Sequence, residues 1–197
     1  SFSNLTSDEI KMRYSAEDVP MILSSEPGVW AYSESGNGTG YSYVTIRGFD
    51  QSRIAVFFDG VPLNDNESHQ VYWVDHGDLL SDVDNIQIQR GIGNNLYGSS
   101  AFGGSINVNT KIASDEREIS GTIGSGDWNT QKIRASYRSG SDLGDDLSLA
   151  VRLSDIKSDG YRQFHDSYQR GFSLGLEHRG KAINQFRACL LYTSDAA

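Results

Sequence analysis

Cysteine is nearly absent from this chain of 197 residues. Cys189 is the single one, which excludes an internal disulfide and a cysteine-based metal cluster. Proline is also scarce, with 3 residues, so a Pro-rich linker is excluded. Basic side chains number 17 against 26 acidic ones, and the net charge of −9 argues against nucleic acid as a partner. Apolar runs reach only five residues, as in Ile54–Phe58, so no α-helix is expected to span a bilayer.

Two features divide the chain near Lys111–Asp115. Residues 1–112 carry 14 acidic and 6 basic side chains, whereas residues 113–197 carry 12 and 11. The hydrophobic periodicity also changes at this point, from mixed segments to repeated alternation. We therefore expect one domain over residues 1–112 and a second over residues 113–188.

The first domain has the pattern of an α+β fold. A short helix is expected from Asp18, which places Pro20 in the first turn, to the break at Pro27-Gly28. Asp59-Gly60 is a strong tight-turn signal between two strands. The remaining expected elements are the strands Tyr43–Arg47, Arg53–Phe58, Ile86–Arg90 and Ser105–Asn109 and the polar loops Ser33–Ser42 and Asn64–Asp75.

The second domain alternates apolar and polar residues in segments of about ten residues. For example, Ile133 and Tyr137 point to one side of a strand, while Lys132 and Arg134 point to the other. Alternation alone favours a soluble antiparallel sheet with one face on a core. The charged side chains need a wide, water-filled lumen, which favours a transmembrane β-barrel instead. The expected strands lie at Ile119–Ile123, Lys132–Tyr137, Leu147–Ser154, Phe172–Glu177 and Asn184–Ala188.

The chain shows no catalytic constellation, so neither an enzyme nor a cofactor nor a metal site is expected. The glycine-rich stretch Gly91–Gly104 lacks the lysine of a P-loop and does not fit the dinucleotide fingerprint. Asp59 and Asp65 have the residue type of a glycosidase pair, but Asp59 is better explained as a turn residue. Solvated charges are favoured over Ca²⁺ ligands for one acidic run, which comprises Asp75, Asp78, Asp82 and Asp84.

Several short motifs, each weak alone, become specific through their order and spacing. They are Pro27-Gly-Val29, Ile46-Arg-Gly48, Phe58-Asp-Gly-Val-Pro62 with Asn64-Asp65, Ile88-Gln-Arg-Gly91, Leu96-Tyr-Gly98, Gly103-Gly104 and Ile106-Asn-Val-Asn-Thr-Lys111. Through them, residues 15–111 resemble the plug domain of TonB-dependent outer-membrane receptors. Residues 118–188 resemble the first strands of the family's barrel, including Asn129-Thr-Gln131 and Ser158-Asp-Gly-Tyr-Arg162. The resemblance implies an α+β plug domain followed by the N-terminal antiparallel strands of a truncated transmembrane β-barrel.

The resemblance also implies a function. Such a receptor lies among the lipids of the bacterial cell outer membrane and takes up a scarce nutrient, such as a ferric siderophore, haem, cobalamin or an oligosaccharide. TonB pulls on an N-terminal box and moves or remodels the plug that gates the barrel lumen. No such box is recognisable in Ser1–Ser15, and the later barrel strands are missing, so we expect a fragment. Residues 189–197 resemble translated adaptor sequence and are expected to be a non-native tail.

The family's motifs assign roles to particular residues. Arg47 and Arg90 match plug arginines that face barrel carboxylates and lock the plug in place. The outward apices of the plug correspond to the loops Ser33–Ser42 and Asn64–Trp73, together with Tyr97. Candidate ligand contacts on these apices are Tyr32, Tyr72, Trp73 and Tyr97 as stacking surfaces and Asn37, Asn66 and Gln70 as hydrogen-bonding groups.

An alternative from another class of protein stays open at this point. Trp30, Trp73 and Trp128 are compatible with a soluble extracellular β-rich carbohydrate-binding module that carries an α/β appendage. Solubility separates the two hypotheses, because a piece of a membrane barrel needs detergent and a soluble module does not.

Overall fold

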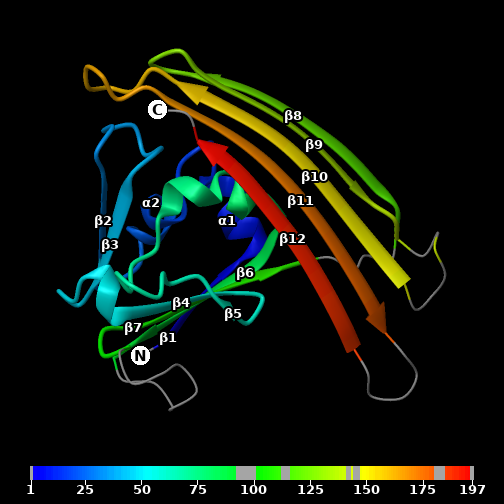
Figure 1. The fold of residues 1–197 in the computed structure, drawn as a ribbon, viewed down its shortest axis with the longest axis horizontal. Coiled ribbons are helices and arrows are strands. Elements are labelled where there is room, and N and C mark those ends of the chain that lie inside the picture. Colours follow the sequence, from blue (N-terminus) through cyan, green and yellow to red (C-terminus); the bar gives the residue numbers. More distant parts are fainter. Residues whose placement is uncertain are drawn as a thin grey trace. The chain divides into compact units, whose positions relative to one another are not determined.

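The computed structural model describes residues 2–91, 101–111, 116–140, 143, 147–179 and 185–195 (Figure 1). The chain forms two compact units. The first comprises Ser1–Val74 and Leu79–Thr110, and the second comprises Asp75–Asp78 and Lys111–Ala197. The short segment Asp75–Asp78 therefore packs with the second unit although its neighbours in sequence belong to the first.

The first unit is built around a five-stranded sheet with the order β1-β6-β7-β4-β5. Its strands are β1 (Phe2–Thr6), β4 (Ile54–Phe58), β5 (Val61–Pro62), β6 (Val83–Arg90) and β7 (Gly104–Thr110). Strands β4 and β7 are parallel, and the other neighbours are antiparallel. The expected turn at Asp59-Gly60 joins β4 to β5, with both residues at positive φ. The four strands expected in this domain correspond to β3, β4, β6 and β7.

The core of the first unit follows from the period-two pattern of these strands. Ile54 and Val56 on β4, Ile86 on β6 and Ile106 and Val108 on β7 are all almost completely buried. On β4 and β6 these positions alternate with half-buried or exposed neighbours, as expected where one face of a sheet covers a core, whereas on β7 Ser105 beside Ile106 is also buried. Leu5 on β1 extends the same apolar face to the sheet edge, opposite Ile86.

The first unit begins with two elements that the sequence patterns did not predict. They are strand β1 and helix α1 (Ser7–Arg13), which meet at a capping box. The Glu9 carboxylate accepts hydrogen bonds from the Thr6 amide and hydroxyl, each at 2.8 Å, and the Thr6 hydroxyl accepts one from the Glu9 amide. These bonds satisfy amide groups that the first helical turn leaves without partners.

The helix expected from Asp18 to Pro27-Gly28 is present as the short helix α2 (Val19–Leu23), with Pro20 in its first turn. Asp18 precedes it but does not cap it, because its carboxylate accepts a hydrogen bond from the Ser42 hydroxyl at 2.5 Å instead.

A two-stranded sheet follows, formed by β2 (Val29–Ser33) and β3 (Ser42–Ile46). The short 3₁₀ helices are η1 (Gln51–Arg53), η2 (Trp73–His76) and η3 (Leu79–Asp82). Within the described part of the chain, no helix combines the length and apolarity needed to cross a membrane.

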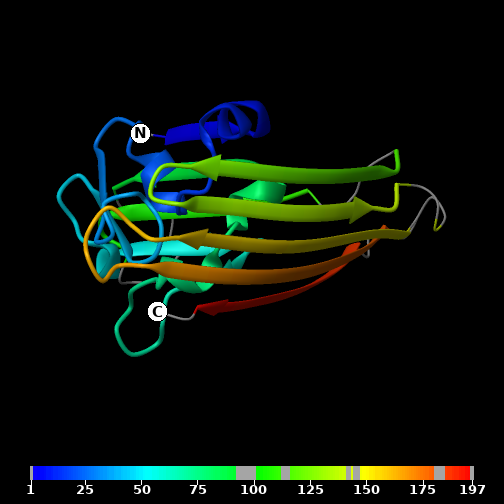
Figure 2. The ribbon, with the colours of Figure 1, turned by 90° about the horizontal axis from the view of Figure 1, so that it is seen from above.

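The second unit contains a continuous antiparallel sheet with the order β12-β11-β10-β9-β8 (Figure 2). Its strands are β8 (Glu118–Gly126), β9 (Thr130–Arg138), β10 (Leu147–Ser158), β11 (Ser167–Arg179) and β12 (Gln185–Asp195). Each strand pairs with its neighbour in sequence, so the topology is a simple meander. Four of the segments expected from alternation lie inside β8–β11, and the fifth, Asn184–Ala188, overlaps β12 from Gln185 on, with Asn184 outside the described residues.

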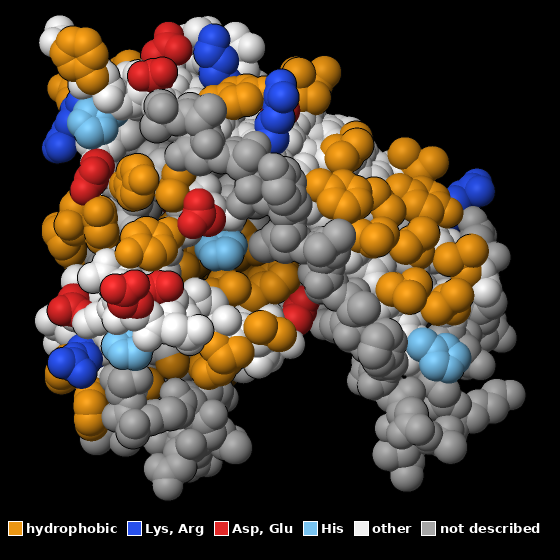
Figure 3. Space-filling model, in the orientation of Figure 1, with side chains coloured by type: hydrophobic (Ala, Val, Ile, Leu, Met, Phe, Trp, Pro, Cys, Tyr) orange, Lys and Arg blue, Asp and Glu red, His pale blue; other side chains and the backbone are white. Residues whose placement is uncertain are grey.

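Burial in this sheet is the reverse of that in a soluble protein. On the inner face, defined by Lys132 and Arg152, polar and charged side chains are buried. On the outer face, defined by Ile133 and Leu153, apolar side chains are exposed, and the exposed fraction of Ile123 reaches 86%. Figure 3 shows hydrophobic side chains gathered over the strands of this sheet. A polar interior and an apolar outer surface are characteristic of a sheet whose outer face contacts lipid.

The outer face changes character near one end of the sheet. Leu153 lies opposite Phe172, and two residues further along β10 the same face carries Asp155, which lies opposite Arg170. The Asp155 carboxylate accepts hydrogen bonds from Arg170 Nε at 3.0 Å and from the Tyr168 hydroxyl at 2.9 Å. On β10 and β11, a row of charged and hydroxyl groups therefore interrupts the apolar surface, whereas β9 carries the exposed Ile133 opposite Asp155.

Candidate functional site

The loop between β2 and β3 is held rigid by its own hydroxyl and amide groups. The Asn37 side-chain oxygen accepts hydrogen bonds from the Ser35 hydroxyl at 2.5 Å and from the amide and hydroxyl of Thr39 at 3.2 and 3.0 Å. The buried Ser33 and Ser35 hydroxyls also bond to each other at 2.6 Å. The Asn37 side-chain carbonyl therefore organises the loop between β2 and β3.

An aromatic ladder, defined by Trp30, Tyr32 and Tyr43, runs along the β2–β3 hairpin below this loop. The ring centroids of Trp30 and Tyr32 are 5.0 Å apart, and those of Tyr32 and Tyr43 are 4.9 Å apart and nearly parallel. Trp30 and Tyr32 are exposed, so two of the three rings present apolar surface to solvent. Exposed, pre-stacked rings lose little conformational freedom on binding, which suits them to contact a planar or cyclic ligand.

The hydroxyl at the inner end of the ladder has an altered acidity. Tyr43 Oη donates a hydrogen bond to Glu34 Oε1 at 2.9 Å. Burial and this bond to a carboxylate raise the pKa of Tyr43 to about 12. The phenol therefore stays protonated at neutral pH and acts as a hydrogen-bond donor that fixes Glu34 beside the loop.

The second loop is organised by Asn64 and Asp65. Asn64 Oδ1 accepts from the Val56 amide at 2.8 Å, and its Nδ2 donates to the carbonyls of Ile54 and His69, both at 2.9 Å. Asp65 Oδ1 accepts from the Ser68 amide at 2.7 Å and from the Ser68 hydroxyl at 2.8 Å. These bonds lower the pKa of the Asp65 carboxyl. The loop is thus a closed turn whose tip, including Asn66, is exposed.

The structure separates the predicted ligand contacts into groups. Tyr32 and Asn37 lie on one hairpin, and Asn66, Gln70 and Tyr72 lie on the second loop. Gln70 Oε1 accepts a hydrogen bond from Gln51 Nε2 at 3.2 Å, and Tyr72 is exposed with its hydroxyl 3.4 Å from the Ser68 hydroxyl. Tyr97, the remaining predicted aromatic contact besides Trp73, lies outside the described residues. The assignment of these residues to ligand binding stays a prediction.

Trp73 is the exception, because the structure contradicts its proposed role. Its side chain is 2% exposed and belongs to the core, next to the buried Val71 and Val74 in sequence. A ring enclosed in this way cannot offer a stacking surface to a ligand. The error arose because Tyr72 and Trp73 are adjacent aromatics, and the change from extended loop to the 3₁₀ helix η2 buries one and exposes the other.

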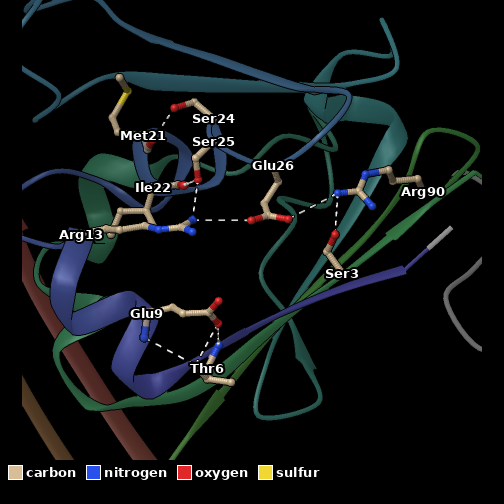
Figure 4. Close-up of polar contacts among 10 residues, drawn as sticks. All are labelled: Ser3, Thr6, Glu9, Arg13, Met21, Ile22, Ser24, Ser25, Glu26 and Arg90. Carbon is tan, nitrogen blue, oxygen red and sulfur yellow. Dashed lines mark hydrogen bonds and ion pairs between the residues drawn. The ribbon is translucent and has the colours of Figure 1, made fainter.

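Arg90 lies in a network within the first unit (Figure 4). Its Nη2 donates to the Ser3 hydroxyl at 2.7 Å and lies 3.6 Å from Glu26 Oε2. The other Glu26 oxygen is 3.5 Å from Arg13 Nη1, which also donates to the Ser25 hydroxyl at 2.6 Å. Glu26 therefore links α1 to the end of β6, and Arg90 links β6 to β1.

Whether Arg47 and Arg90 also lock the plug to barrel carboxylates stays a prediction. Arg47 is exposed, and its amide donates to the Gly28 carbonyl at 2.7 Å.

Sequence reasoning missed Asp78. It was interpreted as one of several solvated charges, but its side chain is completely buried within the second unit. Asp78 Oδ1 lies 2.7 Å from Lys132 Nζ, and the Asp78 backbone carbonyl accepts a hydrogen bond from Arg152 Nη1 at 2.6 Å. The neighbouring Asp75 is exposed, as expected for a solvated charge. Local sequence holds no signal that distinguishes Asp78, apart from the glycine that precedes it.

Two hairpin tips meet at one end of the sheet in the second unit. The Asp159 amide donates to the Trp128 carbonyl at 2.9 Å, and the rings of Trp128 and Tyr161 meet edge to face at 5.5 Å. Trp128 and Tyr161 are both exposed, and Phe164 on the same loop is almost completely so. These tips lie beyond Asp155 on β10, past the apolar stretch of that strand.

Comparison with known proteins gives a consistent result. The family model described as "TonB-dependent Receptor Plug Domain" matches residues 1–105. Among curated proteins, the chain is similar to the vitamin B12 transporter BtuB of Vibrio vulnificus, with 32% identity over 142 residues. It is also similar to the ferrienterobactin receptor of Escherichia coli, with 31% identity over 124 residues. The alignments cover 72% and 58% of this chain but 22% and 17% of those proteins, so the chain spans about a fifth of their length.

Solved structures show the same fold over both units. The Pseudomonas aeruginosa pyoverdine receptor FpvA matches with a TM-score of 0.80 at 14% identity, covering 99% of this chain and 25% of that one. The alcaligin receptor FauA of Bordetella pertussis matches with a TM-score of 0.77 at 18% identity, covering 99% and 32%. These matches give the alternative of a soluble carbohydrate-binding module no support.

Proposed function

Because this chain belongs to the TonB-dependent receptor family, we propose that it is the plug and first barrel strands of a receptor for energy-coupled nutrient uptake. The α+β plug followed by antiparallel strands of an open, truncated transmembrane barrel confirms the predicted fold class. Membership in the family places the chain in the bacterial outer membrane. The receptor moves its ligand and makes or breaks no covalent bond, since the matched relatives are named as transporters and receptors.

The observation that carries this proposal is the reversed burial in strands β9–β11. Exposed Ile133 and Leu153 alternate with buried Lys132 and Arg152. A soluble sheet would bury the apolar side chains and expose the charged ones. When the outer face contacts lipid and the inner face lines a polar lumen, the apolar and the charged side chains each lie in a favourable environment. A plug domain attached to such strands has the architecture of a gated pore, and gating is what TonB energises in our proposal.

The ligand is a scarce nutrient, and we infer a siderophore or a corrinoid rather than haem or an oligosaccharide. The inference is supported by the relatives, which are named for vitamin B12 and for ferric enterobactin. On this chain, the aromatic ladder supplies the surface for such ligands, because corrin and catechol rings both present flat faces for stacking. Tyr32, Asn37 and the tip of the second loop supply the directional contacts in this proposal.

The partner that supplies energy is TonB. Strand β1 lies at the edge of its sheet and pairs with β6 alone among the described strands. A force applied to the chain before Phe2 reaches this edge strand first, where few hydrogen bonds resist it. The plug is therefore expected to open from β1 inward, with the strands β4, β6 and β7 retained longest.

The proposal is tested on the receptor that carries this chain, recovered by sequencing outward from both ends in the source DNA. Uptake of labelled cobalamin and of ferric siderophores is measured in hosts that have TonB and in hosts that lack it. We expect uptake of one ligand class with TonB and none without it. Equal uptake in the two hosts, or a reading frame that stops within a few residues of β12, would overturn the proposal.

The ladder is tested in the same receptor by Tyr32→Ala. Loss of one stacking ring is expected to weaken ligand binding about fivefold, since such ring contacts contribute on the order of 1 kcal/mol. Phe49→Ala is the matched control, because Phe49 is an exposed aromatic beyond the opposite end of β3 from the loop. Equal effects of the two changes on affinity would exclude the ladder as the contact surface.

A further inference from the structure

The inner face of the second unit's sheet encloses a carboxylate from a distant part of the sequence. Asp78 lies on the segment Asp75–Asp78, and its side chain is 0% exposed. Lys132 Nζ lies 2.7 Å from Asp78 Oδ1, and Arg152 Nε lies 4.0 Å from Asp78 Oδ2. Arg152 Nη1 also donates to the Asp78 carbonyl at 2.6 Å. Two buried cations on neighbouring strands therefore hold one carboxylate and its own backbone.

The backbone of this segment approaches the strands more closely than a side chain would permit. A Cβ on Gly77 would lie 2.5 Å from Gln169 Oε1, and a Cβ on Gly171 would lie 2.6 Å from the Ser154 hydroxyl and 3.6 Å from the Gly77 carbonyl. Glycine on both sides lets the segment lie flat against β10 and β11. Asp78 itself has φ of 58°, a conformation that asparagine and glycine also adopt readily.

Beside the carboxylate, Gln169 has unused hydrogen-bonding capacity. Its residue is 3% exposed, and neither its Nε2 nor its Oε1 has a hydrogen-bond partner among the described residues. A buried amide without partners is costly unless something else occupies the site part of the time. Gln169 on β11 and Lys132 on β9 both align with Ile156 on β10, which lies between them. The Gln169 amide therefore faces the same part of the inner surface as Lys132.

Three cations lie on the same face of the sheet as Asp78. Lys132 and Arg134 lie two residues apart on β9, and Arg152 lies on the adjoining strand β10. A group of cations on one face favours an anionic partner at this point.

We propose that Lys132, Arg152 and Gln169 form an anion-binding site in which Asp78 is the internal ligand. The site accepts a small carboxylate, or a phosphate oxygen, whenever the carboxylate of Asp78 is removed. In the receptor proposed above, movement of the segment Asp75–Asp78 uncovers this site to an anionic group in the lumen. That last step rests on the proposed function, whereas binding of an anion in place of Asp78 does not.

The test is chemical rescue in the full 197-residue chain in detergent micelles. Asp78→Gly removes the carboxylate and leaves a residue suited to the positive φ, with room for acetate. We expect the melting temperature, followed by circular dichroism, to fall by about 10 °C, as for loss of one partner of a buried ion pair. Sodium acetate is expected to restore at least half of this loss, and sodium chloride at equal ionic strength is expected to restore little.

Further variants separate site binding from a general salt effect. Acetate is expected to have no effect on the wild-type chain, and Lys132→Met in the Asp78→Gly background is expected to abolish rescue. Asp155→Asn is the matched control, since Asp155 forms an exposed ion pair with Arg170 on the outer face, and acetate is expected to leave its melting temperature unchanged. Equal effects of acetate and chloride on Asp78→Gly would overturn the proposal.

If Asp78→Gly does not fold, a double-mutant cycle of Asp78→Asn and Lys132→Met tests the proposal instead. We expect the two changes together to lower the melting temperature by clearly less than the sum of the single effects. Strict additivity would overturn the proposal, because it would mean that Lys132 does not recognise the carboxylate. Neither experiment involves TonB or transport, so failure of this site is distinguishable from failure of the proposed function.

Discussion

Asp59 and Thr110 join the turn after β4 to the end of β7 through two hydrogen bonds. The Thr110 amide donates to Asp59 Oδ1 at 2.8 Å, and the Thr110 hydroxyl donates to Asp59 Oδ2 at 2.6 Å. The Asp59 amide in turn donates to the Val108 carbonyl at 2.9 Å. The pair therefore closes the carboxyl ends of two parallel strands, at the point where the chain leaves the first unit.

Asp59→Ala is expected to destabilise the first unit by about 2 kcal/mol, because two bonds to a charged acceptor are lost and φ of 48° becomes strained. Asp59→Asn retains one acceptor and tolerates this φ, so its cost is expected to be about half as large. Urea unfolding followed by tryptophan fluorescence checks the order. An Asp59→Asn variant as unstable as Asp59→Ala would show that the hydrogen bonds contribute little.

Glu26→Gln is expected to loosen β1 at the edge of its sheet. The change removes the carboxylate that Arg13 and Arg90 share, and it leaves the buried Arg90 without its charge partner. We expect amide hydrogen exchange in Phe2–Thr6 to accelerate about tenfold, a loss of about 1.4 kcal/mol. Glu67→Gln, on an exposed loop, is the control. Unchanged exchange in β1 would show that its pairing with β6 suffices.

Glu34→Gln is expected to lower the raised pKa of Tyr43, because it removes the carboxylate that accepts the phenol proton. The pKa of Tyr43 is raised to about 12 from 10.0, so its contribution to stability is complete below pH 10 and is lost as the pH rises towards 12. Ultraviolet titration of tyrosinate compares the two chains. Coincident titration curves would contradict the prediction.

His76 gives the segment Asp75–Asp78 a sensitivity to acid. Burial lowers the pKa of His76, against a smaller opposing effect of Asp75. Its neutral form is therefore favoured in the folded chain, and its contribution to stability is present above pH 6.5 and decreases as the pH falls below that value. We expect His76→Gln to reduce the difference in melting temperature between pH 7.5 and pH 5.5, whereas His165→Gln, an exposed control, leaves it unchanged.

The elements that sequence reasoning predicted are those with a local signal. The expected strand Ile86–Arg90 lies inside β6, and the expected strand Ser105–Asn109 lies inside β7, because alternation reports directly which face is buried. Alternation in the second unit likewise predicted the strands, and the charge on one face predicted the reversed burial. The missed helix α1 did have a signal, the capping-box pair Thr6 and Glu9.

The features that could not be predicted depend on pairing across long stretches of sequence. Asp78 is surrounded by other acidic residues and has the local signature of a solvated charge, and its burial depends on Arg152, 74 residues later. Trp73 is similar, since its burial reflects how η2 packs and not the composition of its loop. Long-range contacts of this kind depend on the assembled fold, so a local sequence pattern does not predict them.

The charged row on the outer face of the sheet has a consequence for the membrane. Asp155 and Arg170 follow directly after Leu153 and Phe172 on the same face, so a shift of the sheet by two residues, about 7 Å, would carry an ion pair into hydrocarbon. Along β10 and β11, a bilayer whose hydrocarbon reaches this ion pair is therefore expected to thin locally there, whereas beside β9 the exposed Ile133 allows hydrocarbon at the same level.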